Sequence, residues 1–425
     1  MPNATEPSPL RDEIAGIPVA RLAREFGTPT FVYDAARIVQ RIRDLAAFDV
    51  VRYAQKANSN LAILDLCRRH GTRVDCVSAG EISRALAAGF QAQGAPPPIA
   101  YTADIFDRES LDLVVERGIY VNCGSPDMID QYGERAGRRD IALRINPGFG
   151  HGHSQKTNTG GEQSKHGIWH EQVPACLERA RRLDLHVSGL HMHIGSGTDL
   201  AHLSKVCGAM EDAVRRVGTG ITSISAGGGL PVPSRAGEPA IDLDAYFELW
   251  NQSRQRIEAE LGHAVSLEIE PGRYLVAESG YLVTEIRAVK QMGRNTFYIV
   301  DAGFNNLPRP ILYGAYHGMS IAPAAGASRE RALREVVVGG PLCESGDIFT
   351  QEEGGFVLTR TLPDAGVGDY LVIEQAGAYG FAMSSNYNSK PHAAELLIED
   401  GRVHLVRRRQ SVEDLIRGES IPPRG

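Results

Sequence analysis

Short apolar runs alternate with longer helical stretches through the middle of the chain. The helical stretches have apolar positions three and four residues apart, and the clearest cover 61–69, 82–88, 173–182, 200–217 and 244–260. The apolar runs predict strands at 50–54, 74–77, 99–102, 119–122, 141–146, 187–193, 221–226 and 266–269. Eight strands with helices between them favour an α/β fold, a (β/α)8 TIM-type barrel, over an open doubly wound sheet.

The pattern changes after residue 280. Strand-like runs at 281–289, 296–300, 335–338, 355–358, 370–374, 394–398 and 403–406 follow one another with Gly and Pro between them. Few helical stretches intervene, which predicts a second, mostly β domain of the sandwich or barrel type. The strand-like run 30–33 is expected to join it. We therefore predict a barrel over 35–280 and a β domain built from 1–34 and 281–425.

Composition narrows the class of protein. Of 425 residues, 42% are hydrophobic and 23% are charged, and the net charge is −7. These values are typical of a globular enzyme, and no basic patch indicates nucleic acid. No apolar run is long enough to span a bilayer, and the first residues lack the pattern of a signal peptide. The six cysteines show no CxxC pairing, so we expect reduced thiols and a cytoplasmic location.

A lysine stands where the first predicted barrel strand ends. Lys56 follows the apolar run 50–54, and helix-forming sequence comes after it. Catalytic groups of parallel α/β folds gather at the carboxyl ends of the strands. Most lysines lie on solvated surface, but an amine at the end of a buried strand is partly desolvated and is nucleophilic toward a carbonyl. We therefore interpret Lys56 as a Schiff-base lysine for pyridoxal 5'-phosphate (PLP).

Three glycines follow the seventh predicted strand. Gly227, Gly228 and Gly229 let backbone N–H groups approach an anion closely, although a plain tight loop uses the same residues. In β/α barrels the loops after strands seven and eight often hold a phosphate. This position favours a phosphate cradle.

The eighth predicted strand ends in Glu270-Pro271-Gly272-Arg273. A carboxylate at a buried strand end needs a partner, and a protonated pyridine nitrogen would serve and would keep the ring an electron sink. Arg273 would suit a phosphate or a carboxylate. An internal ion pair between Glu270 and Arg273 is the alternative.

Histidines end the sixth predicted strand. His191 and His193 are two apart and are expected to share one strand face, where they would bind a metal or place one imidazole on a cofactor ring. Ser196 would then reach a phosphate. A further pair, His151 and His153, lies in a glycine-rich loop. A metal site is therefore the main rival interpretation.

The β domain carries a second group of candidates. Cys343 is either a small hydrophobe or a proton donor, and it stands beside Glu344 in a turn-rich segment. Tyr379 lies between glycines, and Arg309 and Tyr313 are spaced to hold a carboxylate. Each is a weak signal alone, because surface and packing roles suit the same residues.

Together these segments resemble the fold-type III PLP-dependent decarboxylases. The motifs are Tyr-Ala-Gln-Lys-Ala-Asn at 53–58, His-Ile-Gly-Ser at 193–196, the three glycines, Glu-Pro-Gly-Arg at 270–273 and Cys-Glu-Ser-Gly-Asp at 343–347. Within that group, 158–167 and 383–388 resemble the diaminopimelate decarboxylase family. The resemblance covers about 30–415. It implies decarboxylation of meso-2,6-diaminopimelate to L-lysine and CO2, the last step of lysine biosynthesis.

The resemblance also assigns roles to residues. Lys56 would hold the cofactor, His193 would stack on its ring, Glu270 would face the pyridine nitrogen and Cys343 would donate the proton. The implied cofactor-binding residues are Lys56, Asp75, His193, Ser196, Gly227, Gly228, Gly229, Glu270, Pro271, Gly272, Arg273 and Tyr379. The implied substrate-binding residues are Arg273, Arg309, Tyr313, Glu344 and Tyr379. A homodimer with shared sites is implied, in which Cys343 and Glu344 reach the neighbouring subunit's site, and no metal is expected.

The chain departs from the family pattern in two places. His166 stands where a phenylalanine is common in the Ser-Lys-Phe-Gly motif. The third predicted strand ends in Tyr-Thr-Ala-Asp at 101–104, where many members carry a loop with asparagine and lysine. Neither departure touches the inferred chemistry.

Several alternatives stay open. The same chemistry on ornithine, arginine or carboxynorspermidine would change what Arg309 and Glu344 bind, because those substrates differ at the distal end. An alanine racemase has a similar barrel, but Glu270 argues against it, because those enzymes usually place an arginine at the ring nitrogen. A metal-dependent barrel hydrolase would use His191 and His193. A non-catalytic PLP carrier would lack a long β domain with a Cys-Glu pair.

Overall fold

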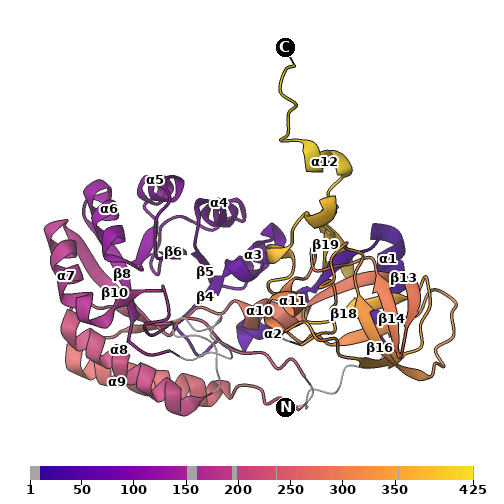
Figure 1. The fold of residues 1–425 in the computed structure, drawn as a ribbon. Helices are drawn as coiled ribbons and strands as arrows, with labels where there is room; N and C mark the ends of the chain where they lie inside the picture. The colour runs from indigo at the N-terminus through magenta and orange to yellow at the C-terminus, as the bar shows by residue number, and fades with distance from the viewer. Residues whose placement is uncertain (1–9, 151–159, 194–198, 236, 353, 425) are drawn as a thin grey trace. The chain divides into compact units, whose positions relative to one another are not determined.

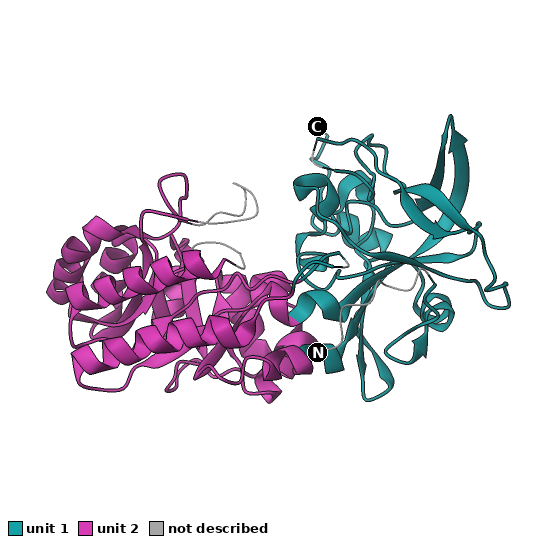
Figure 2. Ribbon diagram, turned by 90° about the horizontal axis from the view of Figure 1, so that it is seen from below, with its two compact units in different colours: residues 1–38, 233–239, 276–425 teal, residues 39–232, 240–275 magenta. Residues whose placement is uncertain are grey.

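A computed structural model describes residues 10–150, 160–193, 199–235, 237–352 and 354–424. The chain divides into two compact units (Figure 2). We call Val39–Val232 with Ala240–Leu275 the barrel unit. We call Met1–Ile38, Pro233–Pro239 and Val276–Gly425 the β unit.

The barrel unit contains a closed sheet of eight parallel strands. Each strand pairs with the next along the chain, β12 pairs with β4, and β8 pairs with β10, which closes the ring. The strands are β4 (Val50–Ala54), β5 (Arg73–Cys76), β6 (Ile99–Ala103), β7 (Tyr120–Cys123), β8 (Arg139–Asn146), β10 (Leu185–His191), β11 (Ser223–Ser225) and β12 (Ser266–Ile269). The predicted TIM-type barrel is confirmed.

Helices lie outside the barrel strands, as Figure 1 shows. They are α2 (Ala35–Arg43), α3 (Leu61–Arg69), α4 (Ala79–Ala87), α5 (Arg108–Arg117), α6 (Pro126–Ala136), α7 (Val173–Arg182), α8 (Leu200–Val217) and α9 (Leu243–Leu261). Side chains of Asn60, Ser78, Asp107, Asp199 and Asp242 accept hydrogen bonds from N–H groups in the first turns of α3, α4, α5, α8 and α9. These caps explain where the helices start, because the first N–H groups of a helix have no partner within it.

The β unit is built on a large mixed sheet with the order β17-β16-β14-β13-β3-β19-β20. Strand β18 pairs with both β13 and β15. The strands are β1 (Glu13–Ile14), β2 (Ile17–Pro18), β3 (Thr30–Asp34), β13 (Gly280–Met292), β14 (Asn295–Val300), β15 (Met319–Ala322), β16 (Leu333–Gly339), β17 (Arg360–Pro363), β18 (Tyr370–Ile373), β19 (Ala394–Glu399) and β20 (Arg402–Arg407). Helices α1 (Val19–Phe26), α11 (Arg309–Tyr313) and α12 (Val412–Ile416) accompany them.

Strand β3 pairs antiparallel with β13 and parallel with β19, which confirms that the early run joins the β unit. The strand predicted at 355–358 is wrong. Only Val357 makes a bridge, to Gln351, and Phe356 is 70% exposed. The run does have a neighbour, because the Glu352 N–H donates to the Phe356 carbonyl and the Leu358 N–H donates to the Thr350 carbonyl. Phe356 and Val357 are both exposed, however, so the run lacks the buried face of a regular strand.

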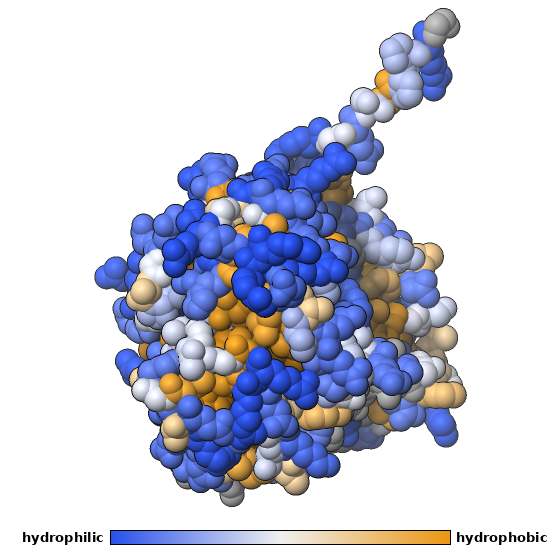
Figure 3. Space-filling view, turned by 90° about the vertical axis from the view of Figure 1, so that its left-hand side faces the viewer, coloured by the Kyte–Doolittle hydropathy of each residue, from blue (hydrophilic) through white to orange (hydrophobic). Residues whose placement is uncertain are grey.

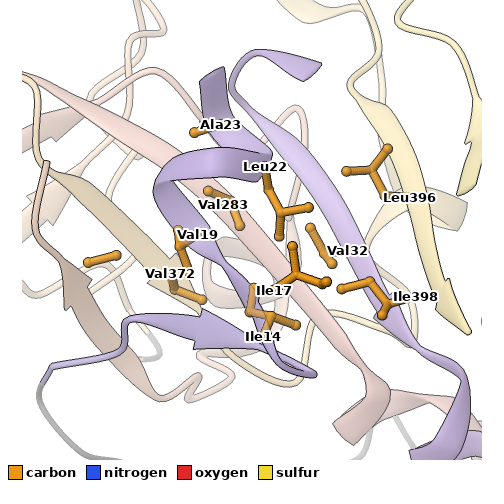
Figure 4. Close-up of a cluster of buried hydrophobic side chains, with 11 residues drawn as sticks. Ile14, Ile17, Val19, Leu22, Ala23, Val32, Val283, Val372, Leu396 and Ile398 are labelled. Carbon is orange, nitrogen blue, oxygen red and sulfur yellow. The ribbon is translucent and has the colours of Figure 1, made fainter. Parts of the chain in front are cut away.

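Helix α1 covers one part of the sheet of the β unit (Figure 4). Its buried residues Val19, Leu22 and Ala23 pack with side chains from β3, β13, β18 and β19. This cluster is a core of the β unit, because its members are at most 7% exposed. Burial of apolar side chains of this size contributes roughly 1.5–3 kcal/mol each.

Among the described residues, no helix combines the length and apolar character needed to cross a membrane. One face of the molecule is mostly hydrophilic, with apolar residues gathered near its centre (Figure 3).

Candidate active site

Glu270 directly follows β12, at the carboxyl end of the barrel. Its side chain is buried. The Nε2 atom of His191 lies 2.7 Å from Oε2, and the Ser225 hydroxyl donates to Oε1 over 2.8 Å. The ends of β10 and β11 therefore supply the partners of a carboxylate that follows β12. Each oxygen of the Glu270 carboxylate therefore has a partner from the end of another strand.

The carboxyl group of Glu270 is held ionised. Burial pushes its pKa up, but the charge and hydrogen bond of His191, the Ser225 hydroxyl and the charge of Arg52 together bring the pKa down to about 2. A hydrogen-bonded buried carboxylate favours its charged form in this way. The site therefore presents a fixed negative charge inside the barrel.

The glycine loop packs tightly against the backbone of Met192 and Glu270. A Cβ on Gly227 would lie 2.6 Å from the Met192 carbonyl oxygen, and one on Gly228 would lie 2.4 Å from the Glu270 carbonyl oxygen. Both contacts are too short for any side chain, so only glycine fits. The Gly228 N–H donates to His193 Nδ1 over 3.2 Å. The Gly227 N–H donates to the Ser225 hydroxyl, also over 3.2 Å.

His193 is a neutral imidazole at physiological pH. Burial lowers its pKa well below the ordinary value, and the charges of Arg144 and Lys56 lower it further. Strand β10 ends at His191, so His193 lies beyond the strand, but the charges of His191 and Glu270 both act on it. His191 binds Glu270, and His193 accepts from the glycine loop. Among the described residues, no group of three potential ligands could hold a metal ion.

Lys56 lies in a single 3-10 turn, Gln55–Ala57, that directly follows β4. Its neighbours Gln55 and Ala57 are buried, but its own side chain is exposed. The side chain is therefore more exposed than the partly desolvated amine that we predicted. Its charge still acts on Asp75 and His193.

Asp75 is buried in β5. Burial raises its pKa well above the ordinary value, the negative charge of Glu270 raises it further, and the charge of Lys56 opposes the shift. Its Oδ1 atom has no hydrogen-bond partner among the described residues. When two carboxyl groups share a low-dielectric site, their pKa values move apart. Here Glu270 is ionised, and Asp75 tends to hold a proton.

Sequence reasoning missed two groups of the site. Ser225, the last residue of β11, was not singled out, although it holds Glu270. Arg144 of β8 is 8% exposed and lies within electrostatic reach of Asp75 and Glu270. Arg144 interrupts the apolar run 141–145 as a single charged residue, which is a signal, whereas Ser225 follows Thr222 and Ser223 in its run and does not stand out.

A second buried carboxylate lies two residues before Glu270. Glu268 of β12 pairs with Arg52 of β4 across a 2.9 Å contact, and Arg52 is 2% exposed. Arg52 also donates to the carbonyl of Pro97. This pair joins neighbouring strands within the barrel.

The β unit gathers the other candidates around α11. The Arg309 guanidinium lies 6.0 Å from the ring centre of Tyr379. The loop that carries Cys343 packs on α11, because a Cβ on Gly346 would touch Ile311 at 2.7 Å. The backbone N–H of Cys343 donates to Asn388 Oδ1 over 2.7 Å.

Within this group Cys343, Glu344 and Tyr313 are exposed. Tyr379 has a positive φ of 57°, an uncommon backbone conformation for a residue other than glycine. Asp347 fixes the loop by accepting the N–H groups of Phe304 and Leu342 over 2.8 Å each. The group therefore presents a cation, a carboxylate, a thiol and two phenols.

The remaining predicted residues are placed as follows. Gly229 completes the glycine loop, and Pro271 and Gly272 connect Glu270 to Arg273, which starts the short helix α10 (Arg273–Val276). A Cβ on Gly272 would meet the Ala54 carbonyl at 3.2 Å. Ser196, His151 and His153 lie outside the described residues.

The residues of the barrel unit suit PLP. A buried, ionised Glu270 matches a protonated pyridine nitrogen, since a carboxylate keeps that nitrogen charged. A neutral imidazole and a loop that admits only glycine lie beside it. A lysine stands at the rim of the same barrel end.

Comparisons with known proteins agree with this chemistry. Residues 35–277 match the family described as "Pyridoxal-dependent decarboxylase, pyridoxal binding domain". The diaminopimelate decarboxylase of Escherichia coli K12 is 56% identical over 93% of this chain and 94% of its own length. The diaminopimelate decarboxylase of Streptomyces coelicolor is 53% identical over 99% of this chain and 96% of its own length.

Solved structures show the same relation. A crystal structure of a diaminopimelate decarboxylase superposes with a TM-score of 0.91 at 55% identity, over 94% of this chain and 95% of that one. The diaminopimelate decarboxylase of Helicobacter pylori complexed with L-lysine superposes with a TM-score of 0.82 at 31% identity, over 93% of this chain and 98% of that one. The chain belongs to the diaminopimelate decarboxylase family of PLP-dependent decarboxylases.

Proposed function

We infer that this chain is a carboxy-lyase that converts meso-2,6-diaminopimelate to L-lysine and CO2 with PLP as cofactor. The observation that carries the inference is Glu270, a buried carboxylate with a pKa of about 2 in a barrel whose relatives are diaminopimelate decarboxylases. PLP supplies an electron sink, which takes up the electron pair left when a carboxylate departs as CO2. A permanently charged partner for the ring nitrogen supports that chemistry.

The barrel unit contributes the cofactor side of the site. We propose that Lys56 binds the cofactor covalently and that Glu270 faces the pyridine nitrogen. His191 and Ser225 hold the Glu270 carboxylate on both oxygens, so it cannot turn away. The neutral ring of His193 offers a flat face without a competing positive charge.

The rest of the cofactor site is proposed from the same barrel end. Asp75 would lie near the cofactor, as the resemblance to the family implies. Gly227, Gly228 and Gly229, with Ser196, Pro271, Gly272 and Arg273, would hold the phosphate region, and Tyr379 would join them. Residues 35–280 would form the cofactor-binding domain.

The β unit, proposed as 1–34 and 281–425, would contribute substrate-binding and dimer contacts. Arg309 would bind the distal carboxylate, and Glu344 would bind the distal ammonium group, with Arg273, Tyr313 and Tyr379 completing the substrate set. Cys343, an exposed thiol, would donate the proton that replaces the lost carboxylate. A substrate that carries an amino acid at each end needs a cation and an anion at the distal end, and this group contains both.

A homodimer with shared sites is part of the proposal. Ile311, Leu312 and Tyr313 are between 37% and 45% exposed and lie beside the exposed Cys343. Apolar side chains that gather at the surface mark contact sites for other chains. Sedimentation velocity would test the dimer.

A cytoplasmic location is also proposed. All six cysteines are free thiols, as expected for a reducing compartment. Thiol titration of protein isolated with a blocking reagent would test this.

The experiment that tests the function is CO2 release from the purified, PLP-loaded protein. Meso-diaminopimelate, L-ornithine, L-arginine and carboxynorspermidine are compared. Release from diaminopimelate alone, with L-lysine as product, is the expected result. Release from another amine would overturn the assignment of Arg309 and Glu344 while keeping the chemistry, and release from none with PLP bound would favour a carrier.

A further inference from the structure

The two places where the chain departs from the family pattern meet in the structure. Asp104 follows β6 directly, and His166 lies in the segment Gly160–Gly167, which we call the anchored segment. The Nδ1 atom of His166 lies 2.5 Å from Asp104 Oδ2. The N–H of Gly167 donates to Asp104 Oδ1 over 2.9 Å. Both oxygens of one carboxylate therefore bind the same segment.

A side-chain amide fixes the other part of the anchored segment. Asn146, the last residue of β8, accepts the N–H of Gly161 over 2.9 Å. It also donates to the carbonyls of Gly161 and His166, both over 3.2 Å. Gly167 has a φ of 79°, and a Cβ there would lie 3.1 Å from the carbonyl oxygen of Arg144. The segment thus lies directly on the carboxyl ends of β6 and β8.

Asp104 interacts electrostatically with a buried arginine of the site. Burial opposes ionisation of Asp104, but the hydrogen bond from His166, the Gly167 N–H and the charge of Arg144 hold its pKa below the usual range. Arg144 is buried and lies within electrostatic reach of Asp104, Glu270 and Asp75. Asp104 and Glu270 therefore both act on the same buried guanidinium group.

We propose that Asp104 and His166 form a positioning pair, which holds the anchored segment at the carboxyl end of the barrel in the place that the substrate requires. An ordinary surface ion pair is worth little, because water competes with it. This pair differs in two respects. The side chain of His166 is only 31% exposed and that of Asp104 only 20%. The Asp104 carboxylate also binds a backbone N–H in addition to the imidazole. The kinetic part of the proposal rests on the proposed function, but the anchoring part does not.

Lys165 provides a direct readout of anchoring. It is exposed and directly precedes His166, so trypsin cleaves after it when the segment opens. Asp104→Asn keeps an acceptor for the Gly167 N–H but removes the charge that binds His166. We expect cleavage after Lys165 in the native protein to rise about tenfold, the scale of losing one charge-assisted hydrogen bond in a local opening. Rates are normalised to those of the same variants unfolded, and the peptide is followed by mass spectrometry.

The matched control is a second His–Asp pair of the barrel unit. His186 Nδ1 lies 2.9 Å from Asp140 Oδ1, near the amino ends of β8 and β10. Asp140→Asn should leave cleavage after Lys165 unchanged. His166→Phe should match Asp104→Asn, and the double variant should be no worse than either single variant, because each removes the same interaction.

The holoenzyme gives the kinetic arm. We expect Asp104→Asn and His166→Phe to raise KM for diaminopimelate at least threefold with kcat within twofold, because a positioning pair acts on substrate placement. Cleavage equal to that of wild type, additive effects of the two substitutions, or faster cleavage with an unchanged KM would each overturn the proposal. If the wild-type enzyme does not act on diaminopimelate, the proposed function fails, and the cleavage arm still decides whether the pair anchors the segment.

Discussion

Replacing Glu270 by glutamine should separate the charge of this residue from its shape. Glutamine fills nearly the same volume and still offers one oxygen to His191 or Ser225. It carries no negative charge, so the ring nitrogen of a bound cofactor would lose its counter-ion. The substitution therefore changes the charge at this position and leaves the packing nearly unchanged.

The size of the expected loss of stability follows from the pKa of the Glu270 carboxyl group. Its fall from the ordinary 4.5 to about 2 corresponds to about 3 kcal/mol in favour of the ionised form, at roughly 1.36 kcal/mol per pKa unit. The Glu270→Gln variant should therefore lose up to about 3 kcal/mol of stability. A hydrogen bond to a charged group exceeds a neutral one by roughly 1–2 kcal/mol, so kcat should fall about 5- to 30-fold or more.

The matched control is Glu268→Gln, which changes a second buried carboxylate two residues away. It leaves Arg52 buried without its partner, so this variant should lose about 3–5 kcal/mol of stability. Both variants should melt at lower temperature by differential scanning calorimetry of the cofactor-free protein. Only Glu270→Gln should lower kcat per mole of bound PLP in a CO2-release assay. A kcat within threefold of wild type for Glu270→Gln, or an equal loss in Glu268→Gln, would refute the role given to Glu270.

Three further outcomes are expected. Lys56→Ala should abolish covalent cofactor binding, seen as loss of the visible absorbance band after gel filtration, and CO2 release at the wild-type rate would contradict the assigned role. Cys343→Ala should lower kcat at least tenfold with an unchanged melting temperature, because the exposed thiol adds little to packing. The stability of the cofactor-free protein should fall as pH drops from about 4.5 to about 2, because Glu270 has a lower pKa in the native state than in the unfolded chain. Equilibrium unfolding at several pH values measures this dependence. If Glu270→Gln left the slope of the unfolding free energy against pH unchanged, Glu270 would not be its source.

The barrel was predictable because its strands are short, apolar and regularly separated. The predictions for β4 and β12 have the observed bounds. Strand β9 (Ile168–Trp169) was not predicted, because two residues carry no periodicity. Strand β13 extends to Met292, beyond the predicted end, since its pairing with β14 continues where the side chains are exposed.

The site was predictable only in part. Lys56, Glu270 and the glycine loop stand at strand ends, and that position can be recognised from the sequence. The partners of Glu270 could not be assigned, because His191 and Ser225 come from strands 79 and 45 residues away from it. Periodicity is local, whereas a barrel brings together strand ends from distant parts of the chain. For the same reason the contact between Asp104 and His166 was not foreseen, although both residues were singled out.

The place of β3 in its sheet has a consequence for how the chain assembles during synthesis. β3 lies between β13 and β19, and its residue Thr30 pairs with Val283 on one side and Ala394 on the other. A growing chain therefore exposes both edges of β3 until β13 emerges, and one edge until β19 emerges. All eight barrel strands are complete by Ile269, so the barrel is free to fold first. A chain that stops before Ala394 would leave an open strand edge, which invites pairing with other chains and aggregation.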